Sequence, residues 1–169
     1  DGQVLTSTGS GSPPVFEDAG GGVTNAKFTA AVASGQANVT GDGTAYDIKG
    51  SIFTEIKDYG TNHVDGTFTA PEDGFYLFTG GIYVGGSSAQ DEVYIYLVTE
   101  NDTVRCWDGD TAAIQNTSGF TYLGFSQLHW LDSGDEAFMR YRVGGTSKVF
   151  DLHGDGAQSY THWSGALLA

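Results

Sequence analysis

The chain has 169 residues, of which 26 are glycine and 13% are aromatic, and it carries a formal net charge of −14. Its seven lysines and arginines are scattered along the sequence, so they form no cationic groove for phosphates, which excludes nucleic acid and anionic membrane as partners. The single cysteine, Cys106, excludes an internal disulfide and a cysteine-based zinc site. No apolar run reaches the roughly 18 residues that a membrane-spanning helix needs, so no membrane insertion is expected.

At the start of the chain, residues 1–22 are predicted to be a short extended linker or the end of a stalk. Glycine, serine and proline dominate this segment, and such a composition favours flexible or extended backbone. Its only apolar pairs are Val4-Leu5 and Val15-Phe16, which could contact a neighbouring chain. Residues 23–169 are predicted to form one head domain.

From residue 23 onward, short apolar runs separated by turn signals predict an all-β sandwich. Glycine, asparagine and aspartate occupy the turns, where they supply positive φ angles and side-chain caps. No window shows a sustained helical repeat, so little or no α-helix is expected. The predicted strands lie at residues 26–32, within 46–56, and at 66–68, 74–84, 92–100, 103–107, 119–131, 136–143 and 163–168.

Two of the predicted strands, 92–100 and 119–131, have apolar or aromatic side chains on both faces. A strand with one solvated face would be polar on that face. One face must pack on the second sheet, so the other needs a partner, and another copy of the same chain is the simplest partner. The predicted interface residues are Tyr94, Tyr96, Leu123 and Phe125.

Four segments carry a family resemblance: FTA at 28–30, GTFTAPEDGFYLF at 66–78, LDSGDEA at 131–137 and WSGALL at 163–168. Their order and spacing are similar to those of C1q-type globular heads, which share a jelly roll with tumour necrosis factor (TNF) ligands. Trp163 and Ala137 stand where that family usually has phenylalanine and valine. The resemblance implies a two-sheet antiparallel jelly roll of roughly eight strands. It also implies a homotrimer, with apolar residues of one sheet on the three-fold axis.

The segment GQVLTSTGSGSPP at 2–14 is similar to a segment found in bacteriophage fibres and other virion proteins, often just before a terminal head. This resemblance implies a location on the virion surface. It also implies that the N-terminal segment contacts other virion or fibre proteins.

The candidate ligand residues are aromatic or polar side chains in predicted loops, where binding surfaces are usually found. Tyrosine and tryptophan faces stack on the apolar side of a sugar ring, so a host-surface glycan is the expected ligand. The candidates are Trp107, Tyr59, Tyr160 and His153. Trp107 fits equally well as a core residue at a strand end.

The head is expected to need no cofactor, and calcium is the one ion that its acidic loops suggest. Carboxylates on glycine-rich backbone supply the hard oxygen ligands that calcium prefers. The candidate ligands are Asp108, Asp110, Asp132 and Asp135. Asp-Gly sequences are also good turn formers, so turn chemistry alone is an alternative explanation for these residues.

The favoured function is therefore a non-catalytic trimeric head of a phage tail fibre that binds a host-surface glycan or protein. One alternative is a purely architectural trimer that locks a fibre or decorates a capsid, and another is a secreted C1q-like lectin. An enzyme is disfavoured, because no catalytic motif is present. A glycan-degrading enzyme would also need a facing pair of carboxylates, and the spacing of the acidic residues indicates none.

Overall fold

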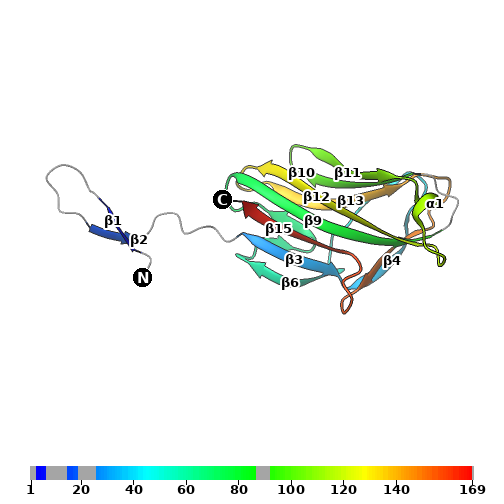
Figure 1. The fold of residues 1–169 in the computed structure, drawn as a ribbon, viewed down its shortest axis with the longest axis horizontal. Helices are drawn as coiled ribbons and strands as arrows, with labels where there is room; N and C mark the ends of the chain where they lie inside the picture. The colour runs from blue at the N-terminus through cyan, green and yellow to red at the C-terminus, as the bar shows by residue number, and fades with distance from the viewer. Residues whose placement is uncertain (1–2, 7–14, 19–25, 87–91, 169) are drawn as a thin grey trace.

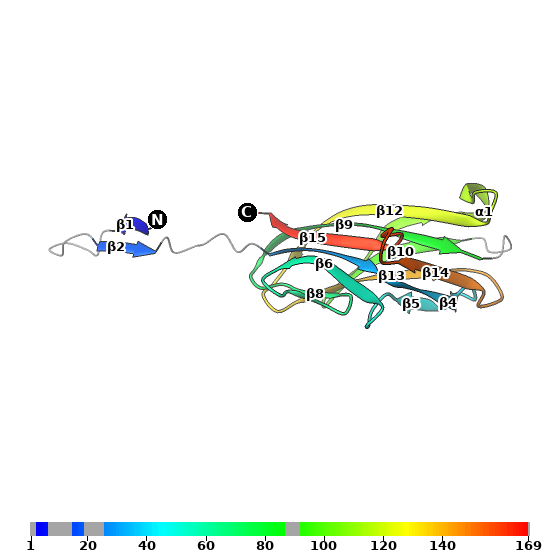
Figure 2. The ribbon, with the colours of Figure 1, turned by 90° about the horizontal axis from the view of Figure 1, so that it is seen from below.

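The computed structural model of the protein describes residues 3–6, 15–18, 26–86 and 92–168. Two antiparallel sheets pack face to face, as Figures 1 and 2 show from two directions. Sheet I contains β4 (Ser34–Thr40), β14 (Phe150–Asp155), β9 (Gly74–Gly85), β15 (His162–Leu168), β3 (Lys27–Val32) and β6 (Phe53–Tyr59), with β12 (Phe120–Leu131) paired to β9. Sheet II contains β11 (Thr103–Gly109), β10 (Val93–Thr99), β13 (Glu136–Val143), β8 (Thr67–Thr69) and β7 (His63–Val64), with β5 (Ala45–Asp47) paired to β13.

The longest ladder joins β9 to β12 over twelve residues, from Phe120 opposite Gly85 to Leu131 opposite Gly74. On the other side of β9, β15 pairs with β9 and also with β3, so the last described strand lies inside sheet I. This confirms the prediction that the apolar C-terminal segment is a strand within a sheet. The fold is all-β with two antiparallel sheets, as the sequence predicts.

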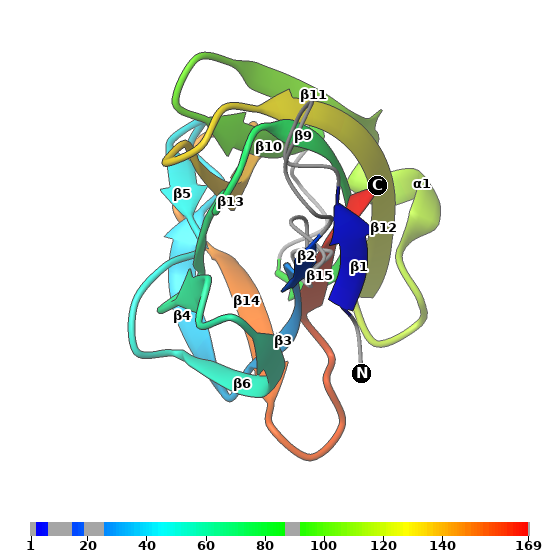
Figure 3. The same cartoon turned by 90° about the vertical axis from the view of Figure 1, so that its left-hand side faces the viewer.

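The core between the sheets is rich in aromatic rings, and Figure 3 shows the two sheets that enclose it. The largest fully buried side chains come from both sheets and include Trp163, Tyr76, Tyr141, Phe68 and Phe78. Burying a side chain of this size contributes roughly 1.5–3 kcal/mol to folding. The closing motif WSGALL therefore contributes the largest ring of the core as well as an inner strand.

A buried histidine belongs to this core. His63 has no exposed surface, and its ring stacks on that of Phe28 with centroids 4.6 Å apart. Its Nε2 accepts a hydrogen bond from Nε1 of Trp163 at 3.2 Å, and its Nδ1 lies 3.4 Å from Oε1 of Glu55. Burial lowers the pKa of His63, although the nearby carboxylates oppose this shift.

Most predicted strands are present within one or two residues of the expected bounds. Three described strands of the sandwich escaped the sequence pattern, because β4 is a polar edge strand, β7 has two residues and β14 contains a glycine. The predicted strand region 46–56 divides into β5 and β6, which belong to different sheets.

The segment predicted as a linker contains a two-stranded sheet. β1 (Gln3–Thr6) pairs with β2 (Val15–Asp18) in an antiparallel ladder, with Val4 opposite Glu17 and Leu5 opposite Phe16. The two apolar pairs noted in the sequence therefore lie in these two strands. The described helix, α1 (Thr111–Ile114), is a single turn, and no helix in the described part of the chain is long and apolar enough to cross a membrane.

Candidate functional site

The side of sheet I that points away from sheet II, called the outer face below, exposes large apolar side chains. Alternation along β9 and β12 places the side chains of these two strands there, because their neighbours in sequence point into the core, and Leu168 of β15 is paired with one of them, Phe75. Five such side chains are about half exposed: Tyr122 (53%), Phe75 (51%), Trp130 (49%), Leu128 (48%) and Leu168 (45%). Exposed apolar side chains gathered on one face often mark an interaction site in soluble proteins.

One end of the outer face is an apolar corner. Trp130 is paired with Phe75, which is paired with Leu168, so the three side chains form one row across three strands. The rings of Phe75 and Trp130 pack edge to face with centroids 5.1 Å apart. Nε1 of Trp130 donates a hydrogen bond to Oδ1 of Asp132 at 2.9 Å. The exposed indole is therefore held in place by a ring on one side and a carboxylate on the other.

The middle of the outer face is formed by small residues. Tyr122 lies over Gly81 so closely that a Cβ at position 81 would be 1.9 Å from the tyrosine hydroxyl oxygen. The ring of Tyr122 also stacks on His162, with centroids 6.2 Å apart. Glycine at 81 thus allows a large ring to lie flat on the sheet.

The opposite end of the outer face has a cluster of four rings from β9, β12, β14 and the loop before β15. Tyr83 lies 5.5 Å from Phe120 and 5.0 Å from Tyr160 between ring centroids. His153 packs edge-on against Phe120 at 4.8 Å. Its Nε2 atom is buried and has no hydrogen-bond partner among the described residues. The structure therefore brings together two predicted ligand residues, Tyr160 and His153.

The other two predicted ligand residues lie elsewhere. Tyr59 is at the end of β6, on the far edge of sheet I, and Trp107 lies in β11 of sheet II. Trp107 is partly buried and packs against the hydrophobic core, which matches the core alternative stated for it. Tyr83 and Phe120 complete the ring cluster and were not selected from the sequence. Tyr83 is paired with His153 of β14, a strand that the sequence pattern missed, and Phe120 is paired with Gly85 of β9.

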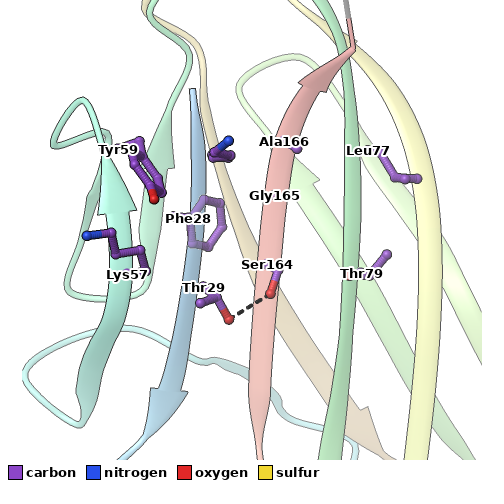
Figure 4. Close-up of a pocket in the computed structure, with 10 residues that line it drawn as sticks. Phe28, Thr29, Lys57, Tyr59, Leu77, Thr79, Ser164, Gly165 and Ala166 are labelled. Carbon is purple, nitrogen blue, oxygen red and sulfur yellow. Dashed lines mark hydrogen bonds between the residues drawn. The ribbon is translucent and has the colours of Figure 1, made fainter. Parts of the chain in front are cut away.

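A depression of about 290 Å³ lies on the outer face where β6, β3, β15 and β9 run side by side (Figure 4). Phe28, Leu77 and Ala166 line it, and Oγ of Ser164 donates a 2.8 Å hydrogen bond to Oγ1 of Thr29. Its outer rim has two ammonium groups beside one ring: Nζ of Lys27 and Nζ of Lys57 lie 4.8 and 4.9 Å from the ring centroid of Tyr59.

The predicted interface residues of β12 are wrong. Leu123 is 1% exposed and Phe125 is 8% exposed, and both belong to the core of the subunit. The alternation in the sequence separated the two faces of this strand correctly, but it carries no information about which face meets sheet II. The opposite face of the strand, with Tyr122, Leu128 and Trp130, is the exposed one.

The two tyrosines predicted at the interface lie on the outward side of sheet II. Tyr94 is 8% exposed because the guanidinium groups of Arg105 and Arg142 lie 4.4 and 5.6 Å from its ring centroid. Its hydroxyl donates to Oε2 of Glu92 at 2.5 Å. Tyr96 is half-buried beside it. Tyr94 is therefore covered by its own subunit, whereas Tyr96 is still partly exposed.

The carboxylates predicted to bind calcium have other partners. Oδ2 of Asp108 accepts from Arg105 at 2.9 Å, and Asp132 accepts from Trp130 as described above. Oδ2 of Asp135 accepts from the backbone N–H of Asp132 at 3.1 Å, which closes the turn after β12. In the described part of the chain, no group of three or more His, Cys, Asp or Glu side chains is placed to hold a metal ion. The predicted four, including Asp110, form no such group.

Comparison with known proteins places the fold in the C1q/TNF jelly-roll class. Murine APRIL superposes with a TM-score of 0.55 and 7% identity, over 85% of this chain and 99% of that one. The globular domain of zebrafish complement 1qA gives 0.57 and 12% over 85% and 98%, and Eiger TNF from S. frugiperda gives 0.57 and 12% over 86% and 94%.

No sequence-family model and no curated protein sequence matches the chain. At 12% identity or less, the structural likeness shows the fold alone. It confirms the predicted two-sheet jelly roll.

Proposed function

We propose that the protein is a non-enzymatic attachment head, which acts as a homotrimer on a phage tail fibre and binds a glycan on the host surface. The observation that carries this proposal is the exposed apolar outer face of sheet I. It lies on strands whose other face forms the core, so it is as rigid as the core itself.

The outer face supports assembly of identical copies. Removing apolar surface from water contributes about 25 cal/mol per Å², so hiding five large half-exposed side chains favours association. Soluble oligomers are mostly closed rings of identical subunits. A three-membered ring suits this face, and the jelly-roll class is the fold for which the sequence resemblance implies trimers. The net charge of −14 keeps such a trimer soluble without a cationic surface.

Two observations support attachment to a host. The segment 2–14 resembles virion fibre sequences, which supports a location on a particle surface. The cluster of Tyr83, Phe120, His153 and Tyr160 gives stacked rings with polar edges, and the Tyr160 hydroxyl donates to Oε1 of Gln158 at 2.6 Å. Rings with one apolar side and one polar edge are typical binding anchors. A sugar would stack on Tyr160 while the polar edges bind its hydroxyl groups.

The test is binding of the purified, fluorescently labelled protein to host cells and to a glycan array. Replacing Tyr160 with alanine should lower the affinity about tenfold, the loss that corresponds to 1.4 kcal/mol. Replacing Tyr96, a half-buried tyrosine of the other sheet, should leave binding unchanged. A trimer that binds neither host cells nor any glycan would contradict attachment and would favour the architectural alternative.

A further inference from the structure

We propose that the outer face contains two complementary corners, and that the acidic corner of one copy docks into the basic depression of the next. The acidic corner is the part of the apolar corner described above where Trp130 binds Asp132. The basic depression is the pocket rimmed by Lys27, Lys57 and Tyr59. Three such contacts close the ring. This inference rests on the proposed trimer and names the surfaces that meet in it.

The two corners lie on opposite edges of sheet I. Among the described strands, β12 pairs only with β9 and β6 pairs only with β3. Beside the two corners, β12 and β6 are therefore the two edge strands of sheet I. Four spacings of about 4.8 Å separate them, which is roughly 19 Å. They cannot touch within one copy. A contact between two different patches on neighbouring copies is the kind that generates a ring.

The strand register places both corners at the same end of sheet I. One row of paired residues crosses the five strands and consists of Leu128, Leu77, Ala166, Lys27 and Tyr59. In a ring whose axis runs along the strands, neighbouring copies are related by rotation about that axis. Rotation does not change a residue's position along the axis, so residues at the same position along the axis meet between copies. The side chain of Leu128 therefore faces the depression of the neighbour, and Trp130 is only one row farther along the same strand.

Charge favours the same pairing. In a chain of net charge −14, two lysines stand beside one tyrosine ring, and no described carboxylate lies within 4.0 Å of either ammonium group. At the other corner Asp132 is exposed and bound to the indole of Trp130. An aromatic ring with a carboxylate thus complements an apolar depression with ammonium groups, which fixes the orientation of the contact.

The floor of the depression suits an apolar side chain. The hydroxyl groups of Thr29 and Ser164 are bonded to each other, so each has a partner without help from an incoming group. Gly165 and Ala166 have little or no side chain, and about 290 Å³ accommodates the edge of an indole ring. The lysine ammonium groups at the rim would then lie near the face of the incoming ring, an attractive geometry.

A charge-reversal cycle tests the pairing in the full chain. Lys27→Glu and Asp132→Lys should each raise the concentration at which the trimer half dissociates by about tenfold, since attraction becomes repulsion in all three contacts. The double variant restores the net charge of the wild type and should return to within about threefold of it. The matched control is Lys148→Glu, which makes the same charge change as Lys27→Glu at an exposed lysine in a loop. It should leave the dissociation concentration of the trimer unchanged.

Crosslinking provides a second readout that does not depend on affinity. Ser126 and Lys57 lie in one row of the register and are both exposed, so a cysteine at each should preserve the fold. In a background with Cys106→Ser, a short bismaleimide should link the two cysteines between copies. Denaturing gels should then show a band of three chain masses. Either cysteine alone should give no such band.

The outcomes separate this inference from the proposed trimer. A wild-type protein that is monomeric would overturn both. A wild-type trimer with no crosslink, and with no rescue in the double charge variant, would overturn the pairing of corners and leave the trimer standing. A depression that binds a small anion while the trimer is intact would also overturn it, because the proposed contact fills that space.

Discussion

At the residue scale, the buried histidine couples the core to pH. His63 accepts a hydrogen bond from Trp163 through Nε2, so Nδ1 carries the proton in the neutral ring. Protonation would put a donor where an acceptor is needed, and it would place a charge at a site with no exposed surface. The folded-state pKa is accordingly lowered from 6.5, with burial as the main cause.

The sign of the pH effect follows from this shift. Above pH 6.5 the histidine is neutral in both states and the fold has its full stability. As the pH falls below 6.5, the unfolded chain takes up a proton first, so stability decreases until the pH reaches the folded-state pKa. We predict a slope of up to about 1.4 kcal/mol per pH unit in the free energy of unfolding below pH 6.5. Chemical denaturation at each pH measures it, and an equal slope in His63→Phe would contradict this assignment.

Trp163 is the other residue on which the core depends. It is fully buried, and its ring packs against those of Phe28 and Phe78 with centroids 4.7 and 5.8 Å away. Trp163→Ala should lower the free energy of unfolding by about 3–5 kcal/mol, as other large-to-small core changes do. Trp163→Phe keeps a ring and should cost less. Equal losses in the two variants, measured by urea denaturation, would argue against ring packing as the cause.

At the element scale, β12 separates folding from assembly, because its two faces serve different purposes. Leu123 points into the core and Leu128 points outward from the same strand. Leu123→Ser should lower the free energy of unfolding by more than about 2 kcal/mol, since it leaves a cavity and a buried hydroxyl. Leu128→Ser should change it by less than about 1 kcal/mol but weaken the trimer. Denaturation measures the first effect and light scattering the second, and similar effects from both variants would contradict the two-face assignment.

The same strand shows how far sequence reasoning reaches. Alternation in 119–131 correctly grouped Leu123 with Phe125 and Tyr122 with Leu128, because period two is a local property of the backbone. Which group meets sheet II depends on the packing of strands distant in sequence, so the interface was assigned to the wrong group. The ring cluster was half predicted for a related reason. Tyr160 lies in a loop and His153 in β14, a segment expected to be a loop, but Tyr83 and Phe120 join them only through sheet pairing.

The edge strands were harder to predict than the inner ones. β15 and β9 have the strong apolar pattern of strands with neighbours on both sides, and both were expected from the sequence. β4 has the sequence SGQANVT and pairs at an edge, where polar side chains are favourable. Its identity as a strand comes from its partner β14, with which it pairs through two register shifts.

At the scale of the whole molecule, the most informative feature is the distribution of exposed apolar side chains. Exposed large apolar side chains occur singly at Val64 of β7 and Ile114 of α1, and they gather on one face of sheet I. There, three strands present Phe75, Tyr122, Leu128, Trp130 and Leu168 to the solvent in the single chain. The strongly acidic remainder of the surface favours solubility and does not cover this face. Three copies in a ring that meet through the apolar corner of Phe75, Trp130 and Leu168 would cover that end of the face and leave the ring cluster around Tyr160 open to a ligand.

The most direct test is the mass of the full chain in solution, measured by light scattering after gel filtration at micromolar concentration. Burial of the outer face between copies predicts three times the chain mass of 17.8 kDa. It also predicts that Leu128→Ser shifts this mass toward that of one chain while the circular dichroism spectrum stays unchanged. A wild-type protein with the mass of one chain, its outer face open to water, would contradict the account.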